Sequence, residues 1–191
     1  MASDGKQAFA VWLTGLPSSG KSTITRELVA LLAARGVRVR VLESDAVRRE
    51  ITPNATYGTA ERDLFYAALG YMARLLTEHG IPVIVDATAN RRAYRDRTRA
   101  GIPLFLEVHV RCPLAVCRSR DPKKIYRRGA EGTAPNVPGL SAPYETPLNP
   151  EVTVEGDRDA PAESARRILE AMEERGFLPP VKGRRAPPRT P

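Results

Sequence analysis

The residues best suited to chemistry form one short segment near the N-terminus, Gly15-Leu16-Pro17-Ser18-Ser19-Gly20-Lys21-Ser22. Its glycines, its lysine and its last serine have the spacing of a phosphate-binding loop, and an apolar stretch precedes it while an amphipathic one follows. The two glycines allow a tight turn whose backbone N–H groups point at phosphate oxygens, and the helix after the loop adds its positive end. The motif therefore predicts a nucleoside triphosphate site.

Each polar residue of this loop has an expected role. Lys21 is expected to reach the β and γ phosphates and to act in catalysis, and the Ser22 hydroxyl to ligate Mg²⁺. Thr23, the next residue, is expected at the α-phosphate. The other nucleotide contacts are expected from the loop itself, at Gly15, Ser18, Ser19 and Gly20.

The phosphate-binding loop alone does not define the reaction, but the basic residues further along the chain reduce the number of reaction types to consider. The sequence lacks the Asn-Lys-x-Asp tetrad with which GTPases read guanine. Basic residues instead surround Asp121-Pro122, and among them we expect Arg120 and Lys123 to reach the site. Phosphoryl transfer spreads negative charge in the transition state, which mobile Arg and Lys side chains can cover while they exclude water. The pattern favours phosphoryl transfer to a small acceptor.

Carboxylates follow two of the expected strands. Asp45 comes at the carboxyl end of the second strand, where open α/β sheets hold ligands, so it is a candidate to accept the proton of an acceptor hydroxyl or to hold a Mg²⁺ water. The alternative for Asp45 is a helix N-cap. Arg48 lies one helical turn further and is a candidate to grip an anionic acceptor. Asp86 ends the third strand and is expected near Mg²⁺.

Five arginines occupy residues 91–99. Helical spacing spreads them around a helix, so at most two can face the ligand crevice. We expect Arg92 to face the acceptor and the other four to lie at the surface. Cys112 and Cys117 are expected to be small buried residues and not a redox pair.

The rest of the chain predicts the scaffold for these residues. Apolar, β-branched segments at 9–14, 37–42, 81–86, 104–110 and 151–154 predict five strands. Helical patterns lie between them, at 21–35 and 60–79, and Pro113 and Asp159 can open two further helices. In 60–79 the expected buried face consists of Leu64, Ala68, Met72, Leu75 and Leu76. This alternation predicts an α/β domain over 8–178 whose parallel sheet is covered on both faces, with an irregular Pro-rich lid at about 121–150.

Composition limits the classes of function. The chain has 191 residues, two cysteines and a formal net charge of +8. Two cysteines cannot build a disulfide framework, no apolar run is long enough to span a membrane, and residues 1–7 do not resemble a signal peptide, so a cytoplasmic protein is expected. The positive excess lies in 88–99, in 111–135 and in 180–191. Residues 1–7 are expected to be flexible and 179–191 a disordered basic tail. This distribution favours phosphate handling over nucleic acid.

Three segments give the chain a family resemblance. GLPSSGKST, RCPLAVCRSRDPKKIYRRG and LSAPYETPLNPEV resemble motifs of the adenylylsulfate kinases, and the likeness covers nearly the whole of 8–178. The resemblance implies a P-loop kinase fold with a central five-stranded parallel sheet. It also implies ATP with Mg²⁺ as donor and the 3′-hydroxyl of adenosine 5′-phosphosulfate as acceptor, with PAPS, the activated sulfate donor, as product. Enzymes of this type are commonly dimers, so a homodimer is expected.

The resemblance also implies roles for individual residues. The family's DGDNVR motif corresponds to ESDAVR here, which places its second Asp on Asp45 and its Arg on Arg48. The family's FSxxDR motif corresponds to a segment that keeps Tyr57 and Arg62 for the acceptor. The lid motif places Arg120 against the ATP adenine and implies a lid role for Lys123.

The acceptor side departs from the family pattern, which leaves two alternatives open. Residues typical of the family are replaced at Phe65, Ala67, Ala68, Ala89 and Val137, whereas the donor side is preserved. The first alternative is a kinase of the same family that acts on a different small hydroxyl compound. The second is a nucleotide-binding regulator or nucleic-acid-binding module that uses the loop as a switch. Asp45 and the basic lid argue against the second, because a switch needs no acceptor site.

Overall fold

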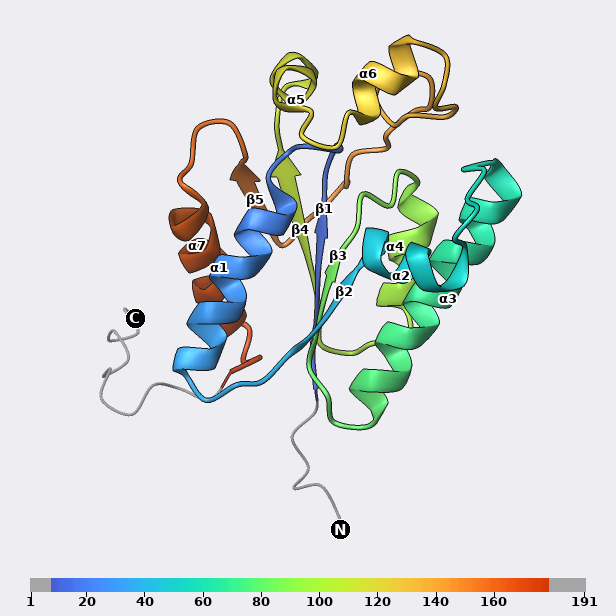
Figure 1. Cartoon of the computed structure of the whole chain (residues 1–191). Coiled ribbons are helices and arrows are strands. Elements are labelled where there is room, and N and C mark those ends of the chain that lie inside the picture. Colours follow the sequence, from blue (N-terminus) through green and yellow to red (C-terminus); the bar gives the residue numbers. More distant parts are fainter. Residues whose placement is uncertain (1–7, 179–191) are drawn as a thin grey trace.

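The structure is a computed structural model that describes residues 8–178 (Figure 1). Its centre is a five-stranded parallel sheet with the strand order β2-β3-β1-β4-β5. The strands are β1 (Ala10–Thr14), β2 (Arg40–Glu43), β3 (Val83–Asp86), β4 (Phe105–Arg111) and β5 (Val152–Glu155). The helices are α1 (Lys21–Ala34), α2 (Ser44–Ile51), α3 (Thr59–Glu78), α4 (Arg92–Arg99), α5 (Leu114–Arg120), α6 (Ile125–Ala130) and α7 (Pro161–Glu174).

Helices cover both faces of the sheet, as predicted. Helices α1 and α7 lie on one face, and α3 and α4 lie on the other (Figure 1). The side chains of β1 alternate between these layers, because successive residues of a strand point to opposite faces. Val11 and Leu13 belong to the core beneath α1 and α7, whereas Ala10 and Trp12 belong to the core beneath α3. Since all five strands are parallel, their carboxyl ends meet at one edge, below α5 and α6 in Figure 1.

All five predicted strands are present, and β2 and β3 are each two residues shorter than expected. Strand β2 begins at Arg40, three residues after the predicted start. It is an edge strand that pairs only with β3, and the register matches Arg40 with Val83, where β3 itself begins. The preceding Val37 and Val39 pack against the core without joining the sheet.

The predicted buried face of α3 is wrong by about one residue. Leu64 is 71% exposed and Leu75 is 39% exposed. The buried residues are instead Arg62, Phe65, Tyr66, Leu69, Gly70 and Ala73. Small residues on this face explain the shift, because α4 approaches closely there. A Cβ added at Gly70 would lie 2.4 Å from the Thr98 hydroxyl oxygen.

The role predicted for Asp159 as a helix cap is also wrong. Helix α7 begins at Pro161 with Ala160 as its N-cap. The Asp159 carboxylate instead accepts hydrogen bonds from the Glu155 N–H and from Arg167, each at 2.9 Å. It therefore fixes the turn between β5 and α7.

Segment 121–150, expected to be irregular, contains the short helix α6. The Asp121 carboxylate accepts hydrogen bonds from the N–H groups of Ile125 and Arg127, at 2.8 and 2.9 Å, and so ties down the start of this helix. Tyr126 and Val137 form a small apolar cluster with the two cysteines, against which Leu16 of the phosphate-binding loop packs. The segment is therefore held directly above that loop.

Two further sequence expectations concern the ends of the chain and membranes. Residues 1–7 and 179–191, expected to be flexible and disordered, lie outside the described residues. Within 8–178, no helix has both the length and the apolar character needed to cross a bilayer.

Candidate active site

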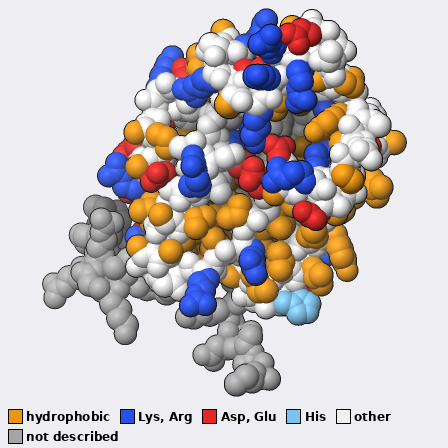
Figure 2. Space-filling model, in the orientation of Figure 1, with side chains coloured by type: hydrophobic (Ala, Val, Ile, Leu, Met, Phe, Trp, Pro, Cys, Tyr) orange, Lys and Arg blue, Asp and Glu red, His pale blue; other side chains and the backbone are white. Residues whose placement is uncertain are grey.

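A cavity of about 730 Å³ opens at the carboxyl edge of the sheet. The phosphate-binding loop, α2, α3, the end of β3 and segment 121–150 all contribute to its wall. Lys and Arg side chains surround the hollow, with acidic side chains between them (Figure 2). It brings together thirteen of the predicted site residues, namely Ser18, Ser19, Gly20, Lys21, Ser22, Thr23, Asp45, Arg48, Tyr57, Arg62, Asp86, Arg120 and Lys123.

The loop between β1 and α1 has the backbone that a phosphate cradle requires. Gly15 has φ +156°, and a Cβ there would lie 2.5 Å from the Val110 carbonyl oxygen. Gly20 has φ +104° and immediately precedes the first turn of α1. Neither position tolerates a side chain without strain. Gly15 itself does not line the cavity but shapes the loop that does.

Lys21 lies inside this loop and is 8% exposed. Its ammonium donates hydrogen bonds to the carbonyl oxygens of Gly15, at 3.0 Å, and of Leu16, at 2.8 Å. Burial lowers the pKa of Lys21, and the nearby Asp86 carboxylate opposes that shift. The loop thus holds a poorly solvated cation, an arrangement that favours an incoming phosphate.

Asp86, at the end of β3, is 4% exposed and faces the start of α1. Burial raises the pKa of Asp86, while the Lys21 charge and a hydrogen bond from Ser22 act in the opposite direction. Asp86 and Ser22 therefore place two oxygen atoms side by side, and their role as Mg²⁺ ligands stays a prediction. In the part of the chain that the structure describes, no group of three or more His, Cys, Asp or Glu residues could hold a metal.

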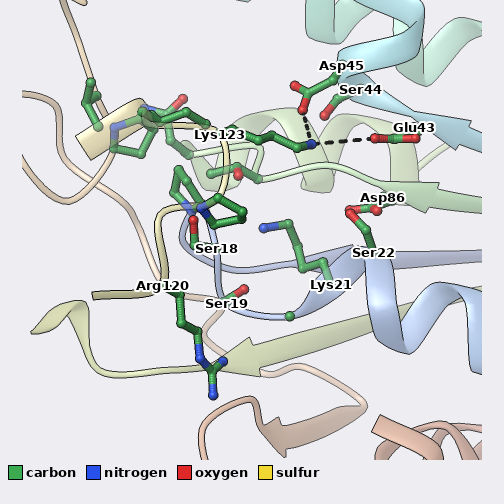
Figure 3. A pocket seen from close by; sticks show the side chains of 18 of the residues that line it. Ser18, Ser19, Lys21, Ser22, Glu43, Ser44, Asp45, Asp86, Arg120 and Lys123 are labelled. Carbon is green, nitrogen blue, oxygen red and sulfur yellow. Dashed lines mark hydrogen bonds and ion pairs between the residues drawn. The ribbon is translucent and has the colours of Figure 1, made fainter. Parts of the chain in front are cut away.

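Lys123 connects segment 121–150 to the end of β2. Its ammonium lies 2.5 Å from an Asp45 carboxylate oxygen and 3.6 Å from a Glu43 carboxylate oxygen (Figure 3). Asp45 lies in the first turn of α2 and does not act as its N-cap, which is Glu43. The role of Glu43 was missed from the sequence, although its position at the end of a strand was a signal.

Two of the three predicted acceptor arginines, Arg48 and Arg62, are almost fully buried in the cavity wall. Arg48 donates a hydrogen bond to Glu61 at 2.9 Å, and its guanidinium lies 3.7 Å from the centre of the Phe65 ring and 4.8 Å from that of Tyr57. Arg62 reaches across the cavity and donates to the Asn136 carbonyl oxygen at 2.5 Å. Both guanidinium groups are thus fixed in orientation before any ligand enters.

Arg120 lies at the end of the cavity opposite Asp45 (Figure 3). Its guanidinium donates to the Gly156 carbonyl oxygen at 2.7 Å. It is the last residue of α5 and lines the cavity together with Gly156 and Asp157, which follow β5. This end is therefore formed by two segments that are 36 residues apart.

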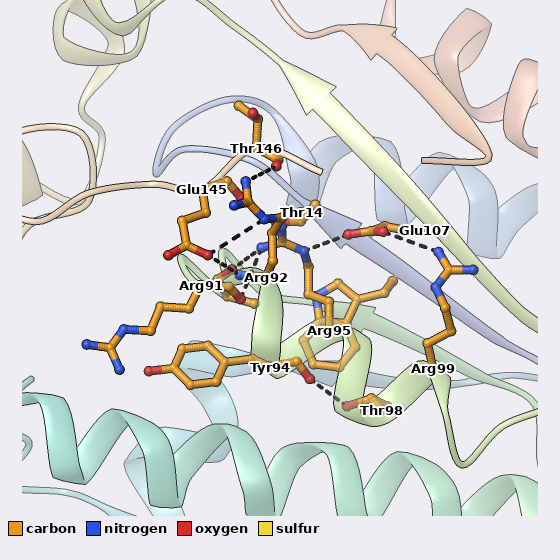
Figure 4. Close-up of polar contacts among 12 residues, drawn as sticks. Thr14, Arg91, Arg92, Tyr94, Arg95, Thr98, Arg99, Glu107, Glu145 and Thr146 are labelled. Atoms are coloured by element: carbon orange, nitrogen blue, oxygen red, sulfur yellow. Dashed lines mark hydrogen bonds and ion pairs between the residues drawn. The ribbon is translucent and has the colours of Figure 1, made fainter. Parts of the chain in front are cut away.

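Two predictions about the arginines of α4 differ from the structure. Arg92 does not line the cavity; its side chain donates to the Thr146 carbonyl oxygen at 3.3 Å and lies 3.9 Å from the Glu145 carboxylate. Arg95, expected at the surface, is 1% exposed and donates to the Glu107 carboxylate at 2.6 Å (Figure 4). A buried carboxylate on β4 explains this, because it requires a paired cation.

Other residues of the cavity wall were missed from the sequence. Thr88 and Asn90, in the turn after β3, and Tyr66, on α3, all line the cavity. The position of Thr88 and Asn90 beyond a strand end was the available signal, whereas Tyr66 gave none. The two cysteines are buried and free, as predicted, and burial raises the pKa of the Cys117 thiol to about 12.

Comparisons with known proteins give similarities that extend over most of the chain. Residues 7–155 match the family model described as adenylylsulphate kinase. The adenylyl-sulfate kinases of Microcystis aeruginosa and Rippkaea orientalis are each 38% identical over 173 residues, which cover 91% of this chain and 96% of each relative. The structure of the Mycobacterium tuberculosis APS kinase in complex with AMPPNP and APS is 30% identical with a TM-score of 0.80, covering 87% of this chain and 98% of that one.

Proposed function

Because the chain belongs to the adenylylsulfate kinase family, we propose that it transfers the γ-phosphoryl group of ATP to the 3′-hydroxyl of adenosine 5′-phosphosulfate, giving PAPS. One observation carries this proposal. A single cavity joins a phosphate-binding loop at one end to Asp45 and two buried arginines at the other. A kinase needs both ends, since it must bind a nucleoside triphosphate and present an acceptor to it.

At the donor end, the loop is built to receive a triphosphate. The Lys21 ammonium donates to two carbonyl oxygens of its own loop, and phosphate oxygens would replace them as acceptors. The positive start of α1 and the loop N–H groups would act on the same phosphates. Because these groups are already in place, they stabilise developing charge without reorganising. The role of Arg120 against the adenine fits its place at this end of the cavity.

The residues present also fit Mg²⁺. Ser22 and Asp86 provide hard oxygen ligands, and Mg²⁺ in kinases is commonly held by one or two protein groups together with waters and substrate phosphates. When bound, the ion neutralises charge on the phosphates. Lys21 stands beside Asp86, so this corner of the cavity already balances opposite charges.

At the acceptor end, we assign Asp45 as the residue that accepts the proton of the attacking hydroxyl. Its carboxylate is partly exposed to the cavity and paired with Lys123. Arg48 and Arg62 would hold the anionic phosphosulfate, and Tyr57, which lies beside both, offers a 40% exposed ring for the nucleobase. The role of Arg92 at the acceptor stays a prediction, because its side chain lies outside this cavity.

We also propose that the chain forms a homodimer. The support is an exposed apolar stripe on α3, formed by Leu64, Tyr71 and Leu75 with spacings of seven and four residues. Exposed apolar patches of this kind often mark protein interfaces. Light scattering would test this. A dimer that becomes a monomer in Leu64→Glu is expected, and a monomeric wild type would contradict it.

The function is tested by a coupled ADP-release assay with ATP, Mg²⁺ and a panel of acceptors. The panel includes adenylylsulfate, free nucleotides and small hydroxyl compounds. Acceleration by adenylylsulfate alone is expected. Acceleration by another hydroxyl compound, with none by adenylylsulfate, would favour the alternative kinase. ATP binding without acceleration by any acceptor would favour a regulator. Cytoplasmic location and the lack of nucleic-acid binding stay predictions.

A further inference from the structure

The turn that follows β3 has a strained residue at its centre. Ala89 has φ +41°, a left-handed value that residues with a Cβ adopt only when their surroundings hold them there. It is fully buried, and its neighbours Thr88 and Asn90 both line the cavity. The backbone at Ala89 therefore determines how these two residues face the cavity.

Two buried side chains hold the backbone of Ala89. Its N–H donates to the Tyr66 hydroxyl oxygen at 3.0 Å, and its carbonyl oxygen accepts a hydrogen bond from the Arg95 guanidinium. Arg95 is fixed in turn by Glu107, at 2.6 Å, and donates to the Glu145 carbonyl oxygen at 2.8 Å. Figure 4 shows Arg95 beside Glu107.

The same wall carries the arginine assigned to the acceptor. The Tyr66 ring packs edge-on against Phe65, with ring centres 5.2 Å apart, and the Arg48 guanidinium lies 3.7 Å from the Phe65 ring centre. On its other side Tyr66 stacks on Tyr94 at 4.5 Å. Tyr66 thus links the strained turn to the acceptor end of the cavity.

We propose that Tyr66 and Arg95 are positioning residues for the acceptor. They hold Ala89 in its left-handed conformation so that Thr88 and Asn90 face the acceptor nucleotide. The identity of that nucleotide rests on the proposed function, whereas the conformation of the turn does not. Asn90 is fixed further by a hydrogen bond from its side-chain amide to the Pro143 carbonyl oxygen at 3.0 Å.

The first test compares two single variants that each remove one hydroxyl. Tyr66→Phe removes the group that holds Ala89, whereas Tyr94→Phe removes a hydroxyl that donates to Asp63 at 2.6 Å. Tyr66→Phe is expected to raise the KM for adenylylsulfate about tenfold and to leave the KM for ATP unchanged. Tyr94→Phe is expected to change neither KM. An equal rise in both KM values for Tyr66→Phe, or no rise, would overturn the proposal.

The double variant Tyr66→Phe with Ala89→Gly separates positioning from direct contact. Glycine adopts positive φ without steric strain, so it needs less support from Tyr66. The double variant is expected to recover most of the lost acceptor affinity. If the Tyr66 hydroxyl acted instead by touching the acceptor, glycine would restore nothing, and that outcome would overturn the proposal.

Amide hydrogen exchange over residues 87–91 gives a readout that does not depend on the acceptor. Faster exchange in Tyr66→Phe than in Tyr94→Phe is expected, at equal thermal stability. Equal exchange in the two variants would overturn the proposal. A wild-type protein that fails to phosphorylate adenylylsulfate would overturn only the proposed function, because the exchange result would still decide whether Tyr66 holds the turn.

Discussion

The Lys123 ammonium lies 2.5 Å from the Asp45 carboxylate, although 78 residues separate the two in sequence. Their side chains are 51% and 43% exposed. Ion pairs at such exposure contribute only about 0–1 kcal/mol to stability, so ligands can displace this one readily. The contact therefore joins segment 121–150 to the acceptor end of the cavity without locking it shut.

Asp45→Asn tests the role of this carboxylate. Since asparagine keeps the shape but cannot accept a proton, kcat is expected to fall by roughly 10²- to 10⁴-fold, with little change in ATP affinity. Steady-state kinetics and calorimetric ATP binding would measure the two effects. Glu50→Gln removes an exposed charge from the same helix and serves as the control. A defect in ATP binding alone would count against a catalytic role.

Lys21→Ala is expected to abolish turnover with every acceptor. The variant removes the Lys21 ammonium, which is buried in the phosphate-binding loop. The expected contact to the β and γ phosphates is lost with it. Arg26→Ala, on the exposed side of α1, is the matched control and should keep its activity. Undiminished turnover in Lys21→Ala would show that the loop does not serve the reaction.

Asp86→Asn tests the Mg²⁺ assignment. Loss of a charged ligand is expected to raise the Mg²⁺ concentration for half-maximal activity by at least about tenfold. Glu43→Gln provides a close control, because Glu43 lies opposite Asp86 in the sheet register but pairs with Lys123. A similar Mg²⁺ dependence in both variants would mean that Asp86 acts only through the overall charge of the cavity.

The sequence predicted the sheet, and thirteen of its fifteen candidate site residues line the cavity, because both predictions depend on local patterns. Apolar runs marked the strands, and the glycine spacing marked the loop. The burial of Arg95 could not be predicted, because its partner Glu107 belongs to another element. Helical spacing alone does not reveal a buried carboxylate. Tyr66 was missed for a related reason, because its partner Ala89 belongs to the turn after β3 and not to its own helix. The buried face of α3 was predicted about one residue away from its true position because α4 approaches α3 closely at Gly70. The apolar spacing of α3 alone does not reveal that approach.

A pH-dependent contribution to stability is expected from Glu151. Burial alone would raise the pKa of Glu151, but hydrogen bonds from Arg99 and from the Glu107 N–H outweigh it and hold the pKa below its ordinary value of 4.5. The carboxylate therefore contributes its full stabilisation above pH 4.5, the ordinary pKa of a glutamate. This stabilisation is lost as the pH falls through the lowered pKa of the folded protein.

Glu151→Gln is accordingly expected to reduce the free energy of unfolding by about 1–3 kcal/mol at neutral pH, and by less in acid. Urea unfolding at neutral pH and at about pH 3 would measure this. Glu163→Gln removes an exposed partner of Arg166 and should have almost no effect. A loss that does not depend on pH would contradict the assigned pKa direction.

The central claim concerns which atom receives the phosphoryl group. The most direct measurement incubates the protein with Mg²⁺, adenylylsulfate and ATP labelled at the γ-phosphate, and locates the label in the product by NMR and mass spectrometry. We predict that the label appears on the 3′-oxygen of adenylylsulfate, and that a 3′-deoxy analogue receives none. Label that stays on ATP, or that reaches the 3′-deoxy analogue equally well, would contradict the assignment.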